Sequence, residues 1–145
     1  MFISSNFDSG NIDVVSCEIA GDGVGEIQLQ IRKDAHSEFY QWFHFRLSGA
    51  KDLSCTLKIL NAGGAAYPPG FENYRLCYSY DRDSWLRHPT QLEKGVLSFN
   101  FKPGYDAVYF AYFAPYSMER HHDLIAKSIQ SPLCSHRLLE GVAKS

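Results

Sequence analysis

The feature that most constrains this fold is a strict alternation of apolar and polar side chains in several short segments. Residues 26–31 read EIQLQI, residues 53–59 read LSCTLKI, and residues 95–101 read GVLSFNF. Successive side chains of a β-strand point to opposite faces, so such a segment has one apolar face and one polar face. The alternation therefore predicts half-buried β-strands and disfavours helices over these residues.

Further segments are predicted as strands because they are rich in β-branched and aromatic residues: 11–20, 41–49, 74–81 and 107–114. The last of them, AVYFAYFA, is apolar almost throughout, which is typical of a central strand covered on both faces. Turn-forming stretches separate the strands: FDSGN, GDGVG, NAGG, YPPGFEN, DRDSW and KPGYD. Short strands with turns at this spacing predict a mainly β protein, an antiparallel β-sandwich.

The apolar period changes after Pro115, where the spacing becomes typical of a helix. Ser117 is suited to the N-cap position of this helix, and Pro132 would end it. We therefore predict that residues 1–131 form one domain, a sandwich with a closing C-terminal helix. Residues 132–145 are predicted to be a linker and the start of a further, catalytic domain.

Composition and charge exclude several classes of function. The chain has 145 residues and a net charge of −2, with scattered basic residues, which disfavours a nucleic-acid partner. The sequence contains no apolar run of membrane-spanning length and no export signal at its N-terminus, so no membrane partner is expected. The four cysteines form no Cys-x-x-Cys pair and are expected to be reduced structural thiols. We expect a cytoplasmic protein.

A run of five polar residues, Glu-Arg-His-His-Asp, is the most conspicuous candidate for a metal site. On a helix, Glu119, His122 and Asp123 would share one face, and a small metallohydrolase could use them. Adjacent His121 and His122 would point about 100° apart and could not chelate one ion together. The polar first turn of a helix explains the run better, so no catalytic and no metal-ligating residue is predicted.

Aromatic residues of a long loop and the two tryptophans are the remaining candidates for binding. The long loop 61–74 carries Tyr67 and Phe71, and it is either an interaction surface or a packed loop. Trp42 and Trp85 could stack on a sugar, but a tryptophan in a strand more often belongs to the core or covers a sheet. A free-standing module that binds a peptide or a glycan through exposed aromatics therefore remains an alternative.

Four segments, taken together and in this order, resemble one protein family. They are FDSGNI, QWFHFRLSG, NAGGAAYPPGFENYRLCYSYDRDSWLRHP and VYFAYFAPYSMERHHDLIA. In this combination the chain resembles the N-terminal domain of cytosolic carboxypeptidases, which are zinc metallocarboxypeptidases. The resemblance covers nearly the whole chain.

The resemblance implies a β-sandwich that precedes an α/β carboxypeptidase domain. In such enzymes the second domain holds zinc through a His-x-x-Glu motif and a later His, a Glu activates a water, and an Arg receives the substrate's terminal carboxylate. Eukaryotic relatives remove C-terminal glutamates, including those of tubulin. None of the six histidines of this chain is followed three residues later by Glu, so none of these roles can be assigned here.

The resemblance leads to a specific functional expectation. The chain would be a non-catalytic domain that packs on a zinc carboxypeptidase domain and supports or gates it. By itself it would be inactive as a hydrolase and need no cofactor, while the parent enzyme would remove C-terminal residues from peptides or proteins. Self-association through an exposed interdomain face is also expected. The residues predicted to contact the catalytic domain are Tyr67, Phe71, Tyr116, His121 and His122.

Overall fold

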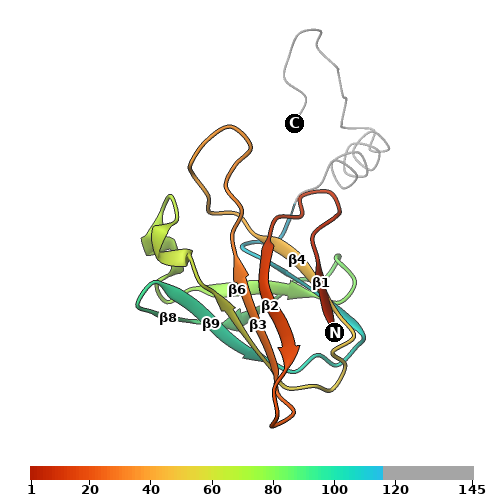
Figure 1. Ribbon diagram of the computed structural model, residues 1–145. Helices are drawn as coiled ribbons and strands as arrows, with labels where there is room; N and C mark the ends of the chain where they lie inside the picture. Colours follow the sequence, from red (N-terminus) through yellow and green to blue (C-terminus); the bar gives the residue numbers. More distant parts are fainter. Residues whose placement is uncertain (116–145) are drawn as a thin grey trace, which may run out of the picture. The chain divides into compact units, whose positions relative to one another are not determined.

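The computed structural model describes residues 1–115, and residues 1–114 form one compact unit, a sandwich of two five-stranded sheets (Figure 1). The first sheet has the strand order β1 (Phe2–Ser4), β4 (His44–Ser48), β10 (Ala107–Ala111), β6 (Arg75–Ser79), β7 (Leu86–Pro89). The second sheet has the order β2 (Asp13–Ile19), β3 (Gly25–Gln30), β5 (Cys55–Ile59), β9 (Val96–Phe101), β8 (Gln91–Glu93). The predicted mainly β sandwich is confirmed.

The prediction that all strands are antiparallel is wrong for one pair. Strand β3 runs parallel to β5, with Ile27 beside Leu57, while every other pair of strands within these two sheets is antiparallel. The chain leaves β3, crosses to β4 in the other sheet and returns to β5. Two crossings reverse the chain twice, so β5 has the same direction as β3. Side-chain alternation gives no information about this order, because it reports only which face of a strand is buried.

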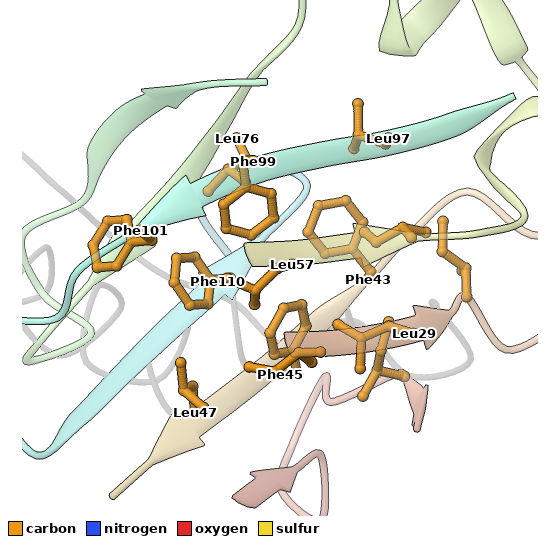
Figure 2. Packing of buried hydrophobic residues seen from close by; sticks show 14 of the residues in the cluster. Leu29, Phe43, Phe45, Leu47, Leu57, Leu76, Leu97, Phe99, Phe101 and Phe110 are labelled. Atoms are coloured by element: carbon orange, nitrogen blue, oxygen red, sulfur yellow. The ribbon is translucent and has the colours of Figure 1, made fainter. Parts of the chain in front are cut away.

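The alternating apolar residues meet between the two sheets and form the core (Figure 2). Phe110 of β10 lies at its centre, with its ring centroid 5.4 Å from that of Phe45, 5.2 Å from that of Phe99 and 5.0 Å from that of Phe101. Strand β10 lies between β4 and β6, so the segment predicted as a central strand does occupy the middle of its sheet. Offset and edge-to-face aromatic contacts of this kind add to the stabilisation that apolar burial provides.

The loop between β5 and β6 packs on the sandwich through two short 3₁₀ turns, η1 (Ala62–Gly64) and η2 (Pro68–Phe71). The ring of Phe71 is only 1% exposed and lies against Tyr74 and Tyr112. Phe71 was predicted to contact another domain, but its ring is buried within this unit and is not available at the surface. The packed-loop interpretation therefore holds for this part of the loop.

Two sequence-based predictions fall outside the described residues. The helix expected from Ser117 and the linker expected at 132–145 both lie there, so they stay predictions. Within residues 1–115 the helical elements are η1 and η2. No helix in this part of the chain has the length and apolar character needed to cross a membrane.

Candidate docking surface around His44

The outer face of the first sheet carries a cluster of aromatic rings around one histidine. On β4, the side chains of His44 and Arg46 point away from the core, because they alternate with Phe45 and Leu47, which point inward. His44 is nevertheless only 2% exposed. Aromatic ring centroids lie 4.8 to 6.1 Å from that of His44, and they belong to Phe7, Trp42, Trp85 and Tyr109. We call these four residues and His44 the His44 cluster.

The FDSGN segment before β2 covers one side of this cluster. Ser9 is its main contact, since its Oγ lies 2.9 Å from His44 Nδ1 and its carbonyl oxygen accepts a 2.7 Å hydrogen bond from Trp42 Nε1. Asn11 forms an antiparallel bridge with His44 through backbone hydrogen bonds of 2.8 and 3.2 Å. A Cβ atom at Gly10 would lie 2.0 Å from the Ser5 carbonyl oxygen, so only glycine fits there. The turn residues therefore fix the position of the histidine.

The DRDSW segment after β6 covers the other side. Asp81 Oδ1 accepts hydrogen bonds from the backbone N–H groups of Asp83 and Ser84, at 2.8 and 2.9 Å. These hydrogen bonds, together with one from the Ser79 hydroxyl, hold the pKa of Asp81 below its usual value. The turn places the guanidinium carbon of Arg82 5.3 Å from the ring centroid of Tyr109, a cation–π contact.

The electrostatics of the cluster keep His44 neutral at pH 7. Burial, as the main cause, and the positive charge of Arg82 together lower its pKa from 6.5 to about 4, although the carboxylate of Asp8 partly opposes them. Two buried nitrogen atoms on the outer face of β4, His44 Nε2 and Arg46 Nε, have no hydrogen-bond partner among the described residues. A buried polar atom without a partner is costly, so these two nitrogens are unfavourable for the stability of this face.

Further aromatic residues, two of them exposed, adjoin the cluster near the end of β10. The ring centroid of Phe113 lies 4.8 Å from that of Trp42, and the Phe113 side chain is 56% exposed. Gln41 bonds through its side-chain amide to the backbone N–H and carbonyl of Tyr67, at 2.8 and 3.0 Å, and to the Tyr112 hydroxyl at 3.2 Å. Tyr67 is 62% exposed. We call Trp42, Tyr67, Tyr112 and Phe113 the aromatic rim.

The structure separates the predicted contact residues into three groups. Tyr67 is exposed on the aromatic rim, Phe71 is buried, and Tyr116, His121 and His122 lie outside the described residues. The alternative metal set of Glu119, His122 and Asp123 also lies outside them. In residues 1–115, no three or more His, Cys, Asp or Glu residues come together in a way that could hold a metal ion.

Sequence reasoning missed the central residue of this surface. His44 was not singled out within the predicted strand 41–49, and FDSGN and DRDSW were interpreted as turns and as parts of the family segments. The interpretation of Trp42 and Trp85 as residues that cover a sheet is confirmed, because both lie against His44. A usable signal was that both turns combine a ring with hydrogen-bonding residues, as Phe7 and Ser9 do.

The three described cysteines have the properties of structural thiols. Cys17, Cys55 and Cys77 are free thiols, and burial raises the pKa of all three. A raised pKa keeps a thiol protonated and unreactive, as expected for structural cysteines. Cys134 lies outside the described residues.

Comparison with known proteins identifies the class of this sandwich. Residues 3–113 match the family described as the cytosolic carboxypeptidase N-terminal domain. The chain therefore belongs to this family. The resemblance inferred from the four sequence segments is confirmed, and all of the His44 cluster and the aromatic rim lie within the matched region.

Individual relatives show how much of a longer protein this chain represents. A metallo-carboxypeptidase from Burkholderia cenocepacia is 44% identical with a TM-score of 0.81, and the match covers 90% of this chain and 33% of that one. A metallo-carboxypeptidase from Pseudomonas aeruginosa is 40% identical with a TM-score of 0.80, covering 89% and 34%. An uncharacterized protein from Zymomonas mobilis is 47% identical over 125 residues, which are 86% of this chain and 32% of that protein. The chain spans about a third of each relative.

Proposed function

We propose that this chain is a non-catalytic domain that packs on the catalytic domain of a zinc carboxypeptidase and supports or gates it. The observation that carries this proposal is that the chain matches only the N-terminal third of metallo-carboxypeptidases. The parent enzyme would remove C-terminal residues from peptides or proteins, with zinc bound in its catalytic domain. The free thiols and the family description support a cytoplasmic location.

The physical basis of the proposal is the contrast between the core and the surface of the described residues. The sandwich has its own core, so it does not depend on a partner for its hydrophobic stabilisation. Its surface, however, carries exposed aromatic rings, among them those of Tyr67 and Phe113. A domain with a complete core and exposed aromatic rings is suited to pack on a neighbouring domain.

A chimeric enzyme tests this proposal. The N-terminal third of the Burkholderia cenocepacia metallo-carboxypeptidase is replaced by residues 1–145 of this chain, and the chimera is compared with the intact enzyme and with the enzyme truncated by that third. Release of the C-terminal residue from a panel of peptides is the measurement. We expect the chimera to approach the intact enzyme to within about tenfold in kcat/KM, about 1.4 kcal/mol, and the truncated enzyme to fall further.

Two outcomes would contradict the proposal. A chimera no more active and no more stable than the truncated enzyme would show that this chain does not support a carboxypeptidase domain. Binding of a glycan or peptide by the 145-residue chain alone, with no effect in the chimera, would favour the free-standing module. Fluorescence of Trp42 and Trp85 reports such binding, because both rings lie near the surface of the His44 cluster.

A further inference from the structure

We propose that a groove between the two sheets binds a small organic acid, whose carboxylate contacts Lys102 and the side-chain amide of Asn100 and whose apolar part lies against neighbouring rings. The groove has a volume of about 600 Å³, which is within the range of small-molecule sites. We call it the Lys102 groove, and besides these two residues its lining includes Thr56, Tyr78, Tyr80, His88 and Phe101. This inference goes beyond the proposed function and does not depend on it.

The Lys102 groove lies where strands of both sheets meet. Strand β8 pairs with β9 only as far as Ser98, so the end of β9 has no neighbour on that side among the described strands. His88 of β7 reaches this end from the other sheet, and its Nε2 donates a 2.7 Å hydrogen bond to the carbonyl oxygen of Asn100. A carbonyl oxygen can only accept, so Nε2 carries the hydrogen. This bond holds the lining from the two sheets together.

Aromatic rings form the apolar part of the lining. Phe101, the last residue of β9, lies at the margin of the core (Figure 2). Its ring centroid is 4.9 Å from that of Tyr78 and 5.1 Å from that of His88, and the Tyr80 ring lies 6.0 Å from that of Tyr78. Both tyrosines are half-buried, so part of each remains accessible. The Tyr80 hydroxyl accepts a 3.0 Å hydrogen bond from the backbone N–H of Gly104 and can still donate its own hydrogen.

The polar part of the lining is rich in hydrogen-bond donors. Thr56 Oγ1 donates a 3.0 Å hydrogen bond to Asn100 Oδ1, which orients the amide and leaves its NH₂ group without a partner in residues 1–115. Lys102 is exposed, and its ammonium group forms no ion pair within the described part of the chain. No Asp or Glu lines the groove, and Glu26, which pairs with Thr56 in the sheet, is not part of the lining. One positive charge beside an oriented amide therefore favours a ligand with a single carboxylate.

A second groove in the same unit provides a contrast. Its volume is about 710 Å³, and it is lined by Glu72, Asn73, Thr90, Gln91, Leu92 and Glu93. Two carboxylates and no cation belong to this lining, so an organic acid should be repelled there although the groove is the larger of the two. The charge of the lining, and not the volume, therefore distinguishes the Lys102 groove as the site for an acid.

An NMR titration of the 145-residue chain with phenylpropionate tests the assignment. We expect shifts of backbone amides in residues 54–56, 78–80 and 100–102, with a dissociation constant of the order of 1 mM for a ligand of this size. Phenylpropionamide has a similar shape without the charge and should bind at least about tenfold more weakly. Lys102→Met should weaken binding of the acid, whereas Lys58→Met, at an exposed position of β5 outside the groove, should not.

A second ligand, the tripeptide Gly-Gly-Phe, distinguishes the sources of the carboxylate. Binding tighter than that of phenylpropionate would identify the end of a peptide chain, and weaker binding would identify a free small acid. Shifts confined to residues 72–73 and 90–93, equal affinities for the acid and its amide, or equal losses in Lys102→Met and Lys58→Met would each overturn the inference. So would the absence of shifts at about twenty times the expected dissociation constant. The activity of the chimera tests the proposed function separately from all of these results.

Discussion

The side chains on the two faces of strand β4 are buried by different kinds of contact. Inward, Phe45 and Leu47 are fully buried against the second sheet, and packing alone stabilises them. Outward, His44 is buried almost as completely, but by two turns that form hydrogen bonds and ring contacts with the cluster. The same backbone therefore carries a core that many apolar sequences could form and a cluster that depends on particular residue types.

The two faces of β4 differ in how strongly they depend on particular residue types. An apolar core tolerates exchange of similar residues, because its free energy depends on volume and area. The His44 cluster places a titratable ring in an environment that opposes its charge and leaves two nitrogens without partners. Exchange of similar residues should therefore be tolerated less well in this cluster than in the core.

The largest effect is expected from the core, and Phe110→Ala measures it. The ring lies at the meeting point of Phe45, Phe99 and Phe101, so its removal leaves a cavity and should lower the free energy of unfolding by about 3–5 kcal/mol. Urea unfolding of the 145-residue chain is the measurement. Val15→Ala, at an exposed position, is the control and should stay within about 0.5 kcal/mol. A loss below that of Val15→Ala would contradict the assigned core.

A pH titration of stability distinguishes the outer face from the core. Because the pKa of folded His44 is about 4 and its ordinary value is 6.5, the unfolded chain takes up this proton first as the pH falls. The contribution of His44 to the free energy of unfolding is therefore complete above pH 6.5. It falls by about 3 kcal/mol as the pH decreases from 6.5 to 4. Urea unfolding at several pH values should show this slope in the natural chain and not in His44→Gln. Equal slopes in both proteins would show that His44 is not held neutral.

The smallest effect concerns the turn that positions the cluster. Gly10→Ala places a Cβ against the Ser5 carbonyl oxygen, so the turn must shift and unfolding should become easier by about 1–3 kcal/mol. The emission of Trp42, whose indole N–H bonds to Ser9, should change at the same time. Gly21→Ala is the matched control, because a Cβ there meets nothing within 4 Å. If the two variants behaved alike, the turn would not be fixing the cluster.

Much of the sandwich was predictable, and the failures have physical reasons. The seven predicted strand segments all contain strands. Alternation identified three of them and enrichment in β-branched and aromatic residues identified the other four, and both are local signals. Strands β1, β7 and β8 were missed because three or four residues are too few to show a period. The parallel pairing of β3 with β5 was missed because a strand's pattern does not say which strand lies beside it.

The candidate surface was predictable only in part. Tyr67 was identified from its exposed aromatic character, and its exposure is confirmed, whereas Phe71 has the same character and is buried. Composition cannot separate these two residues, since their burial depends on whether Tyr74 and Tyr112 are nearby. His44 was not singled out because its surroundings come from segments as distant in the sequence as Phe7 and Tyr109.

The class of fold and the family follow from local features of the sequence. Alternation of side chains and the spacing of turns are local properties, and the order of the four family segments is visible along the chain. The tertiary structure decided which strands pair, and it brought FDSGN and DRDSW to opposite sides of His44. It also decided that the ring is neutral and that two nitrogens lack partners, because burial and hydrogen bonding depend on neighbours that only the folded chain assembles.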